Sequence, residues 1–268
     1  MNLVLPVRKG GLGNQMFQVT AALIVSQETG KELVIPREQS HIHNPLKLAY
    51  EETVFRSIYQ RMQCVLDDTT IYALKQHGFS VYPGEPGFED WNPQLVSHPG
   101  PVILHGYFQN YPPIEKHEEF IRKFFRTNLN CEQGDRTKVG IHVRRGDYLQ
   151  FSDVHYVQDI SYYEKAMDLI KEQNKDPVTF VIFSDDLAWC KQQSLFQQAN
   201  CTFCEESNEI ECLKQMISCE RGFICANSTY SWWAAFLGPH RLRAPCIVPK
   251  KWFKGATVNL FPSEWIQI

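Results

Sequence analysis

Three apolar segments in the second half of the chain run directly into polar clusters. The clusters begin at Arg144, Ser184 and Asn227, directly after residues 139–143, 178–183 and 222–226. In open parallel sheets, ligands bind outside the carboxyl ends of the strands. Alternation of such strands with helical patterns predicts an α/β architecture, and we expect the three polar loops to face one crevice.

The beginning of the chain has the same order of strand, loop and helix. Residues 3–7 are apolar like a buried strand, and residues 10–15 form a glycine-rich turn. Residues 15–28 have the apolar spacing of a helix, and Gly30 is a helix stop signal. With a further strand expected at residues 32–35, this βαβ opening predicts a parallel sheet in the first half as well.

The polar stretch at residues 127–136 is the best candidate for a domain boundary. A chain of 268 residues has room for two domains of ordinary size. We therefore expect an N-terminal domain over residues 1–130 and a C-terminal domain over residues 137–268.

Local patterns predict several further elements. Residues 101–105 and 246–248 read as strands, and residues 114–126 read as one amphipathic helix. Ser161 and Glu164 have the spacing of a capping box at the start of another helix. That helix should bury the face that carries Tyr163, Ala166, Met167 and Ile170.

Charge and aromatic content exclude several classes of protein. The formal net charge is −3, so the chain lacks the diffuse positive charge of a general nucleic-acid binder. An aromatic fraction of 13% is too high for a disordered chain. No apolar run approaches the roughly 20 residues that span a bilayer, so we expect a soluble protein without a membrane span.

Nine cysteines without a secretion signal predict reduced and partly buried thiols. Cys201 and Cys204 have a spacing found in metal sites, but a zinc site needs a second pair at similar spacing. Cys212 and Cys219 are seven residues apart. We therefore expect no metal site.

The densest charge cluster is His142-x-Arg144-Arg145-Gly146-Asp147. Two arginines at a strand end suit a diphosphate, because guanidinium groups make bidentate contacts to phosphate oxygens. Strand residues alternate between faces, so Arg144 and His142 should point one way and Arg145 the other. One arginine is then expected to hold phosphate while the other braces the loop. The alternative is a structural ion pair between one of the arginines and Asp147.

The two remaining clusters supply Ser184, Asp185, Asn227, Ser228 and Thr229. The second of these precedes a helical pattern, and a helix N-terminus is a ready site for an anion. The alternative is ordinary N-capping by Asn227 or Ser228. The Ser-Asp-Asp cluster either binds a ribose, braces the arginines or caps a helix.

The glycine-rich turn fails the test for a dinucleotide-binding fingerprint. Met16 stands where a glycine or alanine is needed, and the acidic residue expected about 20 positions further on is missing. The turn still lets a ligand approach the backbone closely, with Asn14 and Gln15 as amide contacts.

Together these motifs resemble those of the α-1,2-fucosyltransferase family, in the soluble microbial or viral form. They are Gly10-Gly11-Leu12-Gly13-Asn14-Gln15, His142-Val143-Arg144-Arg145-Gly146-Asp147-Tyr148, Phe183-Ser184-Asp185-Asp186 and Asn227-Ser228-Thr229-Tyr230-Ser231-Trp232-Trp233. The resemblance implies an α/β protein with two Rossmann-like domains of the B-type glycosyltransferase fold. It also implies transfer of L-fucose from GDP-fucose to the 2-hydroxyl of a galactose-type acceptor, with inversion and without a metal or other cofactor. A cytoplasmic location is expected, because nucleotide sugars are made there.

The resemblance also implies roles for single residues. Arg144 is the expected partner of the donor's β-phosphate, with His142 and Arg145 beside it. The side chains that match donor-side positions are Ser184, Asp185, Asn227, Ser228, Thr229, Asn14 and Gln15. The guanine edge is expected to be read by a carboxylate, either Glu209 or Glu211.

The expected mechanism places Arg144, Asp147 and His142 in the catalytic machinery. Departure of GDP builds negative charge that a fixed arginine stabilises most in the transition state. The acceptor hydroxyl must also lose a proton. Asp147 is the first candidate for the base, Asp153 and His155 are alternatives, and late proton loss without a base stays open. A second hypothesis is a binding module of the same fold that holds a nucleotide sugar without turnover.

Overall fold

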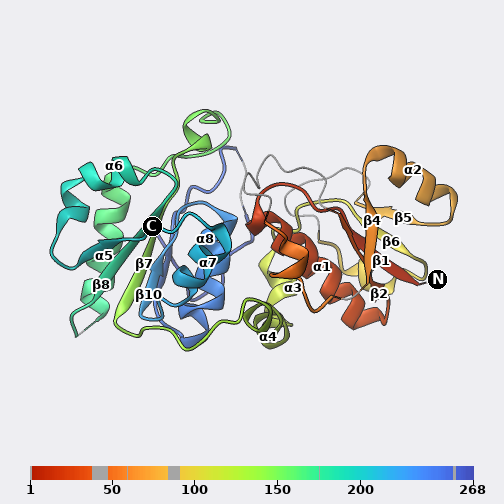
Figure 1. The fold of residues 1–268 in the computed structure, drawn as a ribbon, viewed down its shortest axis with the longest axis horizontal. Coiled ribbons are helices and arrows are strands. Elements are labelled where there is room, and N and C mark those ends of the chain that lie inside the picture. Colours follow the sequence, from red (N-terminus) through yellow and green to blue (C-terminus); the bar gives the residue numbers. More distant parts are fainter. Residues whose placement is uncertain (1, 38–47, 59, 84–90, 175, 256–257) are drawn as a thin grey trace. The chain divides into compact units, whose positions relative to one another are not determined.

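The computed structural model describes residues 2–37, 48–58, 60–83, 91–174, 176–255 and 258–268 (Figure 1). The chain divides into two compact units. The first consists of Met1–Asn128 with Val258–Pro262, and the second of Leu129–Thr257 with Ser263–Ile268. The division after Asn128 falls inside the polar stretch 127–136, whereas the return of residues 258–262 to the first unit was not part of the sequence prediction.

The first unit is built on a parallel sheet of four strands. Its order is β2 (Glu32–Leu33), β1 (Leu3–Pro6), β6 (Val102–Leu104) and β5 (Ser80–Tyr82), and a separate parallel pair joins β3 (Ile35–Arg37) to β4 (Arg61–Val65). The strand predicted at residues 32–35 is therefore divided. After Leu33 the chain leaves β1, and it pairs again with β4 from Ile35 onward.

The helices of the first unit are α1 (Leu12–Thr29), α2 (Asp68–Gln76), α3 (Tyr111–Glu115) and α4 (Glu118–Asn128), with short 3-10 turns at Tyr50–Glu52 and Pro93–Ser97. The predicted end of α1 is confirmed, because Gly30 is left-handed (φ 70°) and its N–H bonds to Ser26 O. The single helix predicted at residues 114–126 is wrong. A break at Lys116 separates α3 from α4.

The second unit is built on a parallel sheet of six strands. The order is β12 (Ile266–Gln267), β11 (Cys246–Val248), β10 (Gly222–Ile224), β7 (Lys138–Val143), β8 (Thr179–Ser184) and β9 (Cys201–Phe203). The chain lays down β7, β8 and β9 outward in one direction, then returns to place β10 on the other side of β7. This is the doubly wound order of a Rossmann fold, with its switch point between β7 and β10.

Gly140 of β7 is paired directly with Phe223 of β10, the two central strands of this sheet. A Cβ on Gly140 of β7 would lie 2.3 Å from the ring of Phe223 on β10. The Phe223 ring occupies the space that a side chain at this position would fill, so glycine is needed there.

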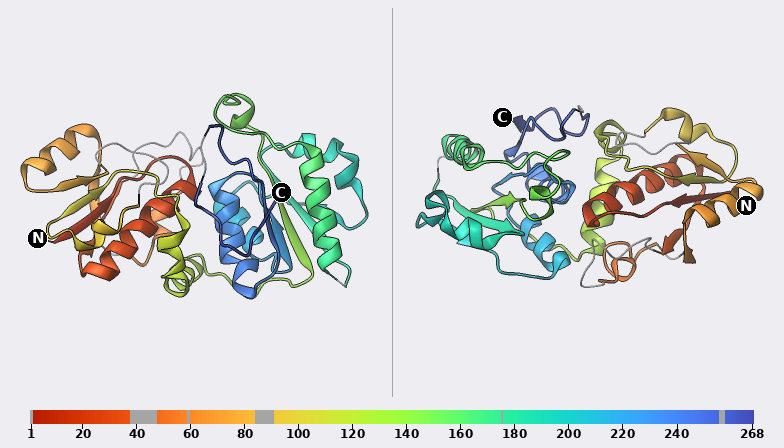
Figure 2. Two further views of the ribbon diagram at one scale, coloured as in Figure 1. Left: turned by 180° about the vertical axis from the view of Figure 1, so that it is seen from behind. Right: turned by 90° about the horizontal axis from the view of Figure 1, so that it is seen from above.

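Helices cover both faces of the six-stranded sheet (Figures 1 and 2). They are α5 (Ile160–Gln173), α6 (Leu187–Gln192), α7 (Glu209–Ile217) and α8 (Thr229–Leu237), with 3-10 turns at Asp147–Leu149, Ser194–Gln197 and Pro239–Leu242. In the views, α5 lies on one face of the sheet and α7 and α8 lie on the other. The buried face predicted for α5, which contains Tyr163 and Met167, is confirmed.

The capping box predicted for α5 is wrong. The helix begins two residues earlier, and Asp159 caps it by accepting from the N–H groups of Ser161 at 3.0 Å and Tyr162 at 3.2 Å. Ser161 lies inside the helix, and its hydroxyl also donates to Asp159 Oδ1 at 2.6 Å. An aspartate two residues before the serine is an equally good N-cap, and local spacing did not separate the two.

Candidate functional site

The three polar loops predicted from the strand ends meet at one edge of the second unit's sheet. Strands β10, β7 and β8 are neighbours, so their carboxyl ends lie side by side. The loop after β7 bonds to both neighbours: Arg144 Nη1 lies 3.1 Å from Asp185 Oδ2, and the Tyr148 hydroxyl donates to Asn227 O at 2.9 Å. The site therefore lies at the switch point, where open α/β sheets bind ligands.

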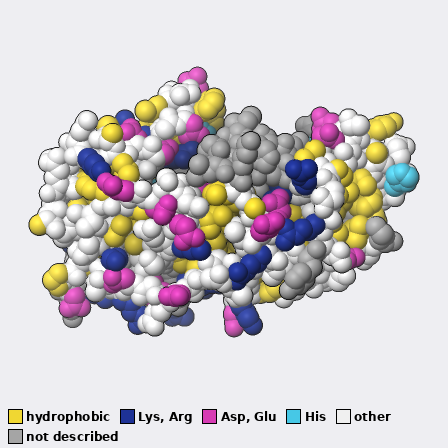
Figure 3. All heavy atoms as spheres, in the orientation of Figure 1, with side chains coloured by type: hydrophobic (Ala, Val, Ile, Leu, Met, Phe, Trp, Pro, Cys, Tyr) yellow, Lys and Arg dark blue, Asp and Glu magenta, His cyan; other side chains and the backbone are white. Residues whose placement is uncertain are grey.

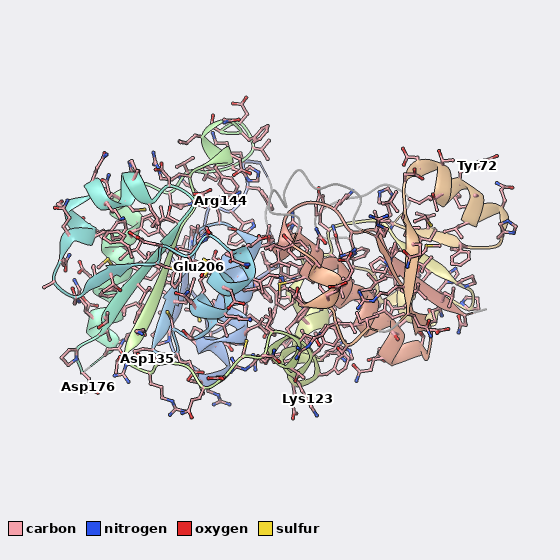
Figure 4. The ribbon with its side chains drawn as sticks, in the orientation of Figure 1. Tyr72, Lys123, Asp135, Arg144, Asp176 and Glu206 are labelled. Carbon is pink, nitrogen blue, oxygen red and sulfur yellow. The ribbon has the colours of Figure 1, made fainter. Side chains whose placement is uncertain are left out.

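Arg144 directly follows the last residue of β7 (Figure 4). Its guanidinium lies between two carboxylates. Its Nη2 is 2.7 Å from Asp147 Oδ1 and its Nη1 is 3.1 Å from Asp185 Oδ2. The guanidinium carbon also lies 5.4 Å from the centre of the Tyr148 ring. About a third of the side chain (32%) remains exposed, so this guanidinium is fixed in place and still open to a ligand.

Arg145 has different neighbours from Arg144, as strand alternation predicted. Its Nε is 3.1 Å from Asp186 Oδ2, and its guanidinium carbon lies 3.9 Å over the ring of Trp189. Asp186 in turn caps α6 by accepting from Trp189 N at 3.1 Å. Arg145 thus fastens the loop to α6. Of the two ion pairs considered for Asp147, the structure has the one with Arg144.

Asp185 holds the arginine loop from its other side. Its Oδ1 accepts the backbone N–H of Arg145 at 2.9 Å while its Oδ2 faces Arg144. A Cβ on Gly146 would lie only 2.6 Å from Oδ2, so the loop wraps tightly around this carboxylate. Ser184 contributes through its hydroxyl, which accepts from Asp186 N at 2.9 Å. Of the alternatives for this cluster, bracing (Asp185) and capping (Asp186) are both present.

Asn227 is buried and cross-links three segments. Its Nδ2 donates to Trp252 O at 3.0 Å, and its Oδ1 accepts from Gln158 Nε2 at 3.2 Å. It therefore does not cap α8. The N-cap residue is Ser228, and its side chain makes no capping hydrogen bond. Sequence reasoning did not select Gln158, because a contact across 69 residues leaves no local signal.

His142 lies below the arginine loop and is almost fully buried (5% exposed). Its ring centre is 5.8 Å from that of Tyr230, and its Nδ1 has no hydrogen-bond partner within the described residues. Burial, and secondarily the charge of Arg144, lower the pKa of His142 to about 3. The ring is therefore neutral at physiological pH.

An aromatic stack supports the other side of Arg144. Tyr148 and His155 are stacked with ring centres 4.1 Å apart, and Phe253 lies 5.7 Å from His155. Burial, with Arg144 adding to it, lowers the pKa of His155, while Asp147 acts in the opposite direction. Asp153, the other alternative base, is exposed on the same loop.

The glycine turn of the first unit forms a second polar cluster, after β1. Gln15 is fully buried; its Nε2 donates to Gly10 O at 3.0 Å and its Oε1 accepts from Arg8 Nη1 at 3.3 Å. Asn14 Oδ1 accepts from Gln109 Nε2 at 3.2 Å, which joins the loops after β1 and β6. Gly10 has φ 79°, a left-handed conformation that favours glycine.

Arg8 is a buried cation that sequence reasoning missed. It donates to Pro36 O from Nε at 3.0 Å and from Nη2 at 2.8 Å, and it forms an ion pair with Glu51. Burial raises the pKa of Glu51, but Arg8, a backbone hydrogen bond and Arg61 together offset this, so the pKa lies below its usual value. Arg8 and Gln15 together fix the shape of the glycine turn.

The two candidates for reading guanine lie on the first turn of α7. The Glu209 carbonyl accepts from the Tyr230 hydroxyl at 2.6 Å, which ties α7 to α8. Glu211 pairs with Lys214 at 2.7 Å and is about half exposed.

On the face shown in Figure 3, acidic and basic side chains are interspersed. Among the described residues, no group of three or more His, Cys, Asp or Glu side chains is placed to hold a metal ion. No helix in the described ranges is both long and apolar enough to cross a membrane, and no disulfide joins the cysteines there.

Comparison with known proteins gives a family match over nearly the whole chain. The sequence model of Glycosyl transferase family 11 matches residues 7–266. An alpha-1,2-colitosyltransferase of Escherichia coli is 28% identical, with 100% of this chain and 99% of that protein aligned. The O-antigen biosynthesis glycosyltransferase WbnK of Escherichia coli is 28% identical over 97% of this chain and 98% of its own length. Galactoside alpha-(1,2)-fucosyltransferase 1 of Gorilla gorilla gorilla is 36% identical over 85% of this chain and 63% of its length.

Among solved structures, a mutant of Arabidopsis thaliana FUT1 in complex with GDP has a TM-score of 0.54 at 10% identity. The alignment covers 92% of this chain and 70% of that one. At this identity the likeness concerns the fold alone. The α/β architecture with two Rossmann-like units is the B-type glycosyltransferase fold that the sequence resemblance implied.

Proposed function

Since the chain belongs to glycosyl transferase family 11, we propose that it transfers L-fucose from GDP-fucose to the 2-hydroxyl of a galactose-type acceptor, with inversion. The observation that carries this proposal is the position of Arg144. It presents a fixed and partly exposed guanidinium at the switch point of a Rossmann sheet. A diphosphate is the ligand that such a group at such a place suits best.

Arg144 is assigned to the diphosphate of the donor. As the bond from fucose C1 to the phosphate oxygen breaks, GDP takes the electron pair and its negative charge grows. A guanidinium that is already oriented by Asp185 and Tyr148 stabilises this charge without turning away from the phosphate. The arginine supplies the positive charge that the leaving group needs, so the proposal requires no metal ion or other cofactor.

The acceptor oxygen forms the new bond to C1 and gives up its proton. Asp147 is the first candidate to accept it, and Asp153, His155 or late loss to water remain alternatives. His142 is assigned a supporting role, because a neutral ring with a pKa of about 3 is not protonated when Arg144 binds an anion. It fills the space below the arginine without adding charge.

The other donor-side residues divide into two groups in this proposal. Asp185 and Asn227 position the loops, because their side chains are engaged with Arg144 and Trp252. Ser184, Ser228 and Thr229 border the same strand ends and are assigned to the nucleotide. In the first unit, Asn14 is assigned to the sugar and acceptor, and Gln15 holds the turn that carries it.

A second candidate donor is GDP-colitose. Colitose is the 3-deoxy form of L-fucose, and the similar colitosyltransferase aligns over the full length of both chains. The two donors differ by one hydroxyl, so the same diphosphate site serves both. A non-catalytic module that binds a nucleotide sugar is a third possibility, and turnover separates it from the other two. We place the protein in the cytoplasm, in keeping with its thiol cysteines.

Thermal unfolding and turnover test the proposal. GDP should raise the melting temperature, because a ligand of the folded state stabilises it by mass action, whereas UDP and NAD should not. Release of GDP should follow with GDP-fucose and a galactose-terminated acceptor, and EDTA should leave the rate unchanged. Absence of any shift with GDP would refute the donor assignment. A rate that is lost with EDTA and restored by manganese would refute the metal-free mechanism.

A further inference from the structure

Arg144 shares its one positive charge between two carboxylates. Asp147 lies 2.7 Å from Nη2 and Asp185 lies 3.1 Å from Nη1. A diphosphate that approaches this cluster therefore meets two negative charges beside the single positive one. Because like charges at this range repel, full engagement of the guanidinium by phosphate favours the departure of one carboxylate.

The two carboxylates are held with different strength. Asp185 is anchored independently of Arg144, since it accepts the Arg145 N–H at 2.9 Å and packs against Gly146. The Asp147 carboxylate has its ion pair with Arg144 and no other hydrogen bond from the described residues. It is also about a third exposed (35%). Asp147 is therefore the carboxylate that can leave at low cost.

We propose that the donor's diphosphate exchanges with Asp147 on Arg144. Before donor binding, Asp147 is tied to the arginine; once phosphate takes its place, the carboxylate is released, while Asp185 keeps the guanidinium aligned. This inference rests on the proposed function and adds a coupling to it, because the first candidate base is freed only when the donor is present. Release of the Asp147 carboxylate thus depends on whether the phosphate site is occupied.

The exchange predicts that removing a charged side chain from the site strengthens GDP binding. Asp147→Asn keeps the size of the side chain and removes the competing charge, so GDP should bind more tightly. A partly exposed ion pair contributes up to about 1 kcal/mol, which corresponds to about a fivefold lower Kd. The donor KM should fall in parallel, and kcat should not rise with it. A purely structural brace would give the opposite result, since its loss disorders Arg144 and weakens GDP binding.

Calorimetric titration with GDP tests this on four full-length proteins. The wild type sets the reference, Asp147→Asn should bind more tightly, and Asp185→Ala should bind more weakly because its anchor is lost. Asp168→Asn is the matched control. It removes one carboxylate from a similar i,i+3 pair, with Lys171 at 3.5 Å on α5, and should leave the Kd unchanged.

One outcome refutes the exchange alone, and another refutes the proposed function as well. If the wild type binds GDP and folded Asp147→Asn binds it equally or more weakly, the exchange is wrong and the donor assignment stands. If the wild type does not bind GDP, the proposed function is wrong and the exchange falls with it. Asp147→Ser serves as a second variant if the melting temperature shows that Asp147→Asn is unfolded.

Discussion

Replacing Arg144 and Arg145 by alanine, one at a time, should separate loss of activity from loss of stability. Arg144→Ala removes the cation assigned to the diphosphate. Its protein partners are partly exposed carboxylates, so we expect a stability loss below about 1 kcal/mol. Loss of a donor that stabilises transition-state charge lowers turnover by on the order of 100- to 1000-fold. Arg144→Lys should also lose most activity, because lysine lacks the planar fork.

Arg145→Ala should behave in the opposite way. Its side chain is 16% exposed, its Nε bonds to Asp186, and its guanidinium stacks on Trp189. A charged hydrogen bond contributes about 1.5–3 kcal/mol and a cation–π contact about 0.5–2 kcal/mol. Since both groups retain some exposure, we expect a loss of about 2–3 kcal/mol. For a unit of this size, the melting temperature should fall by roughly 8–12 °C.

The assay measures GDP release and thermal unfolding for both alanine variants side by side, below the lower melting temperature. Arg144→Ala should melt close to wild type and turn over at least about 100-fold more slowly. Arg145→Ala should melt early and, while folded, retain more turnover than Arg144→Ala. Near-normal turnover in Arg144→Ala would refute the phosphate assignment. An equal drop in melting temperature for both variants would refute the division of roles.

Three further predictions concern single positions around the same loop. Asn227→Ala removes the buried hydrogen bond to the Trp252 carbonyl, so denaturant unfolding should show a loss of about 1–3 kcal/mol; a change within 0.3 kcal/mol, about the error of additivity, would contradict the cross-link. Gly146→Ala places a Cβ 2.6 Å from Asp185 Oδ2, so GDP affinity should fall while Gly100→Ala, whose Cβ would make only an ordinary contact at 3.6 Å with His98, keeps it. His142 has a folded pKa of about 3, below the unfolded value near 6.5, so the unfolded state binds more protons between these limits and stability should decline as pH falls below 6.5. The decline between pH 6.5 and 5 should be shallower in His142→Gln, and an unchanged slope would show that the ring is not buried in its neutral form.

The sequence predicted the parts of this protein that depend on local patterns. The strands around residues 139–143 and 246–248 stand out because they are buried along their length and therefore largely apolar, and residues 178–183 are also largely apolar although β8 is only partly buried. Gly30 marks the end of α1 because few other residues adopt a left-handed conformation. The meeting of the three polar loops followed from sheet topology, since parallel neighbours end at the same edge.

The sequence did not predict features that depend on contacts between residues far apart in the chain. The burial of Arg8 follows from Pro36 and Glu51, which lie 28 and 43 residues away, and a lone arginine after a strand resembles any exposed one. The cross-link from Asn227 to Gln158 and Trp252 was missed for the same reason. Strands β4, β5 and β12 are short, and two of them have mixed burial along their length, so they lack a readable period. The break between α3 and α4 was missed because its apolar spacing continues through it.

Because residues 258–262 belong to the first unit, that unit can be completed only when almost the whole chain has been synthesised. Leu260 is fully buried there, and Asn259 O accepts the N–H of Tyr111 at 2.8 Å. A ribosome therefore releases most of the first unit long before the residues that complete it, and all of the second unit's sheet except β12 is synthesised in between. About 130 residues of the second unit are therefore synthesised before the last segment of the first unit is available. For the same reason, an exchange of units between relatives has to transplant two separate stretches of chain.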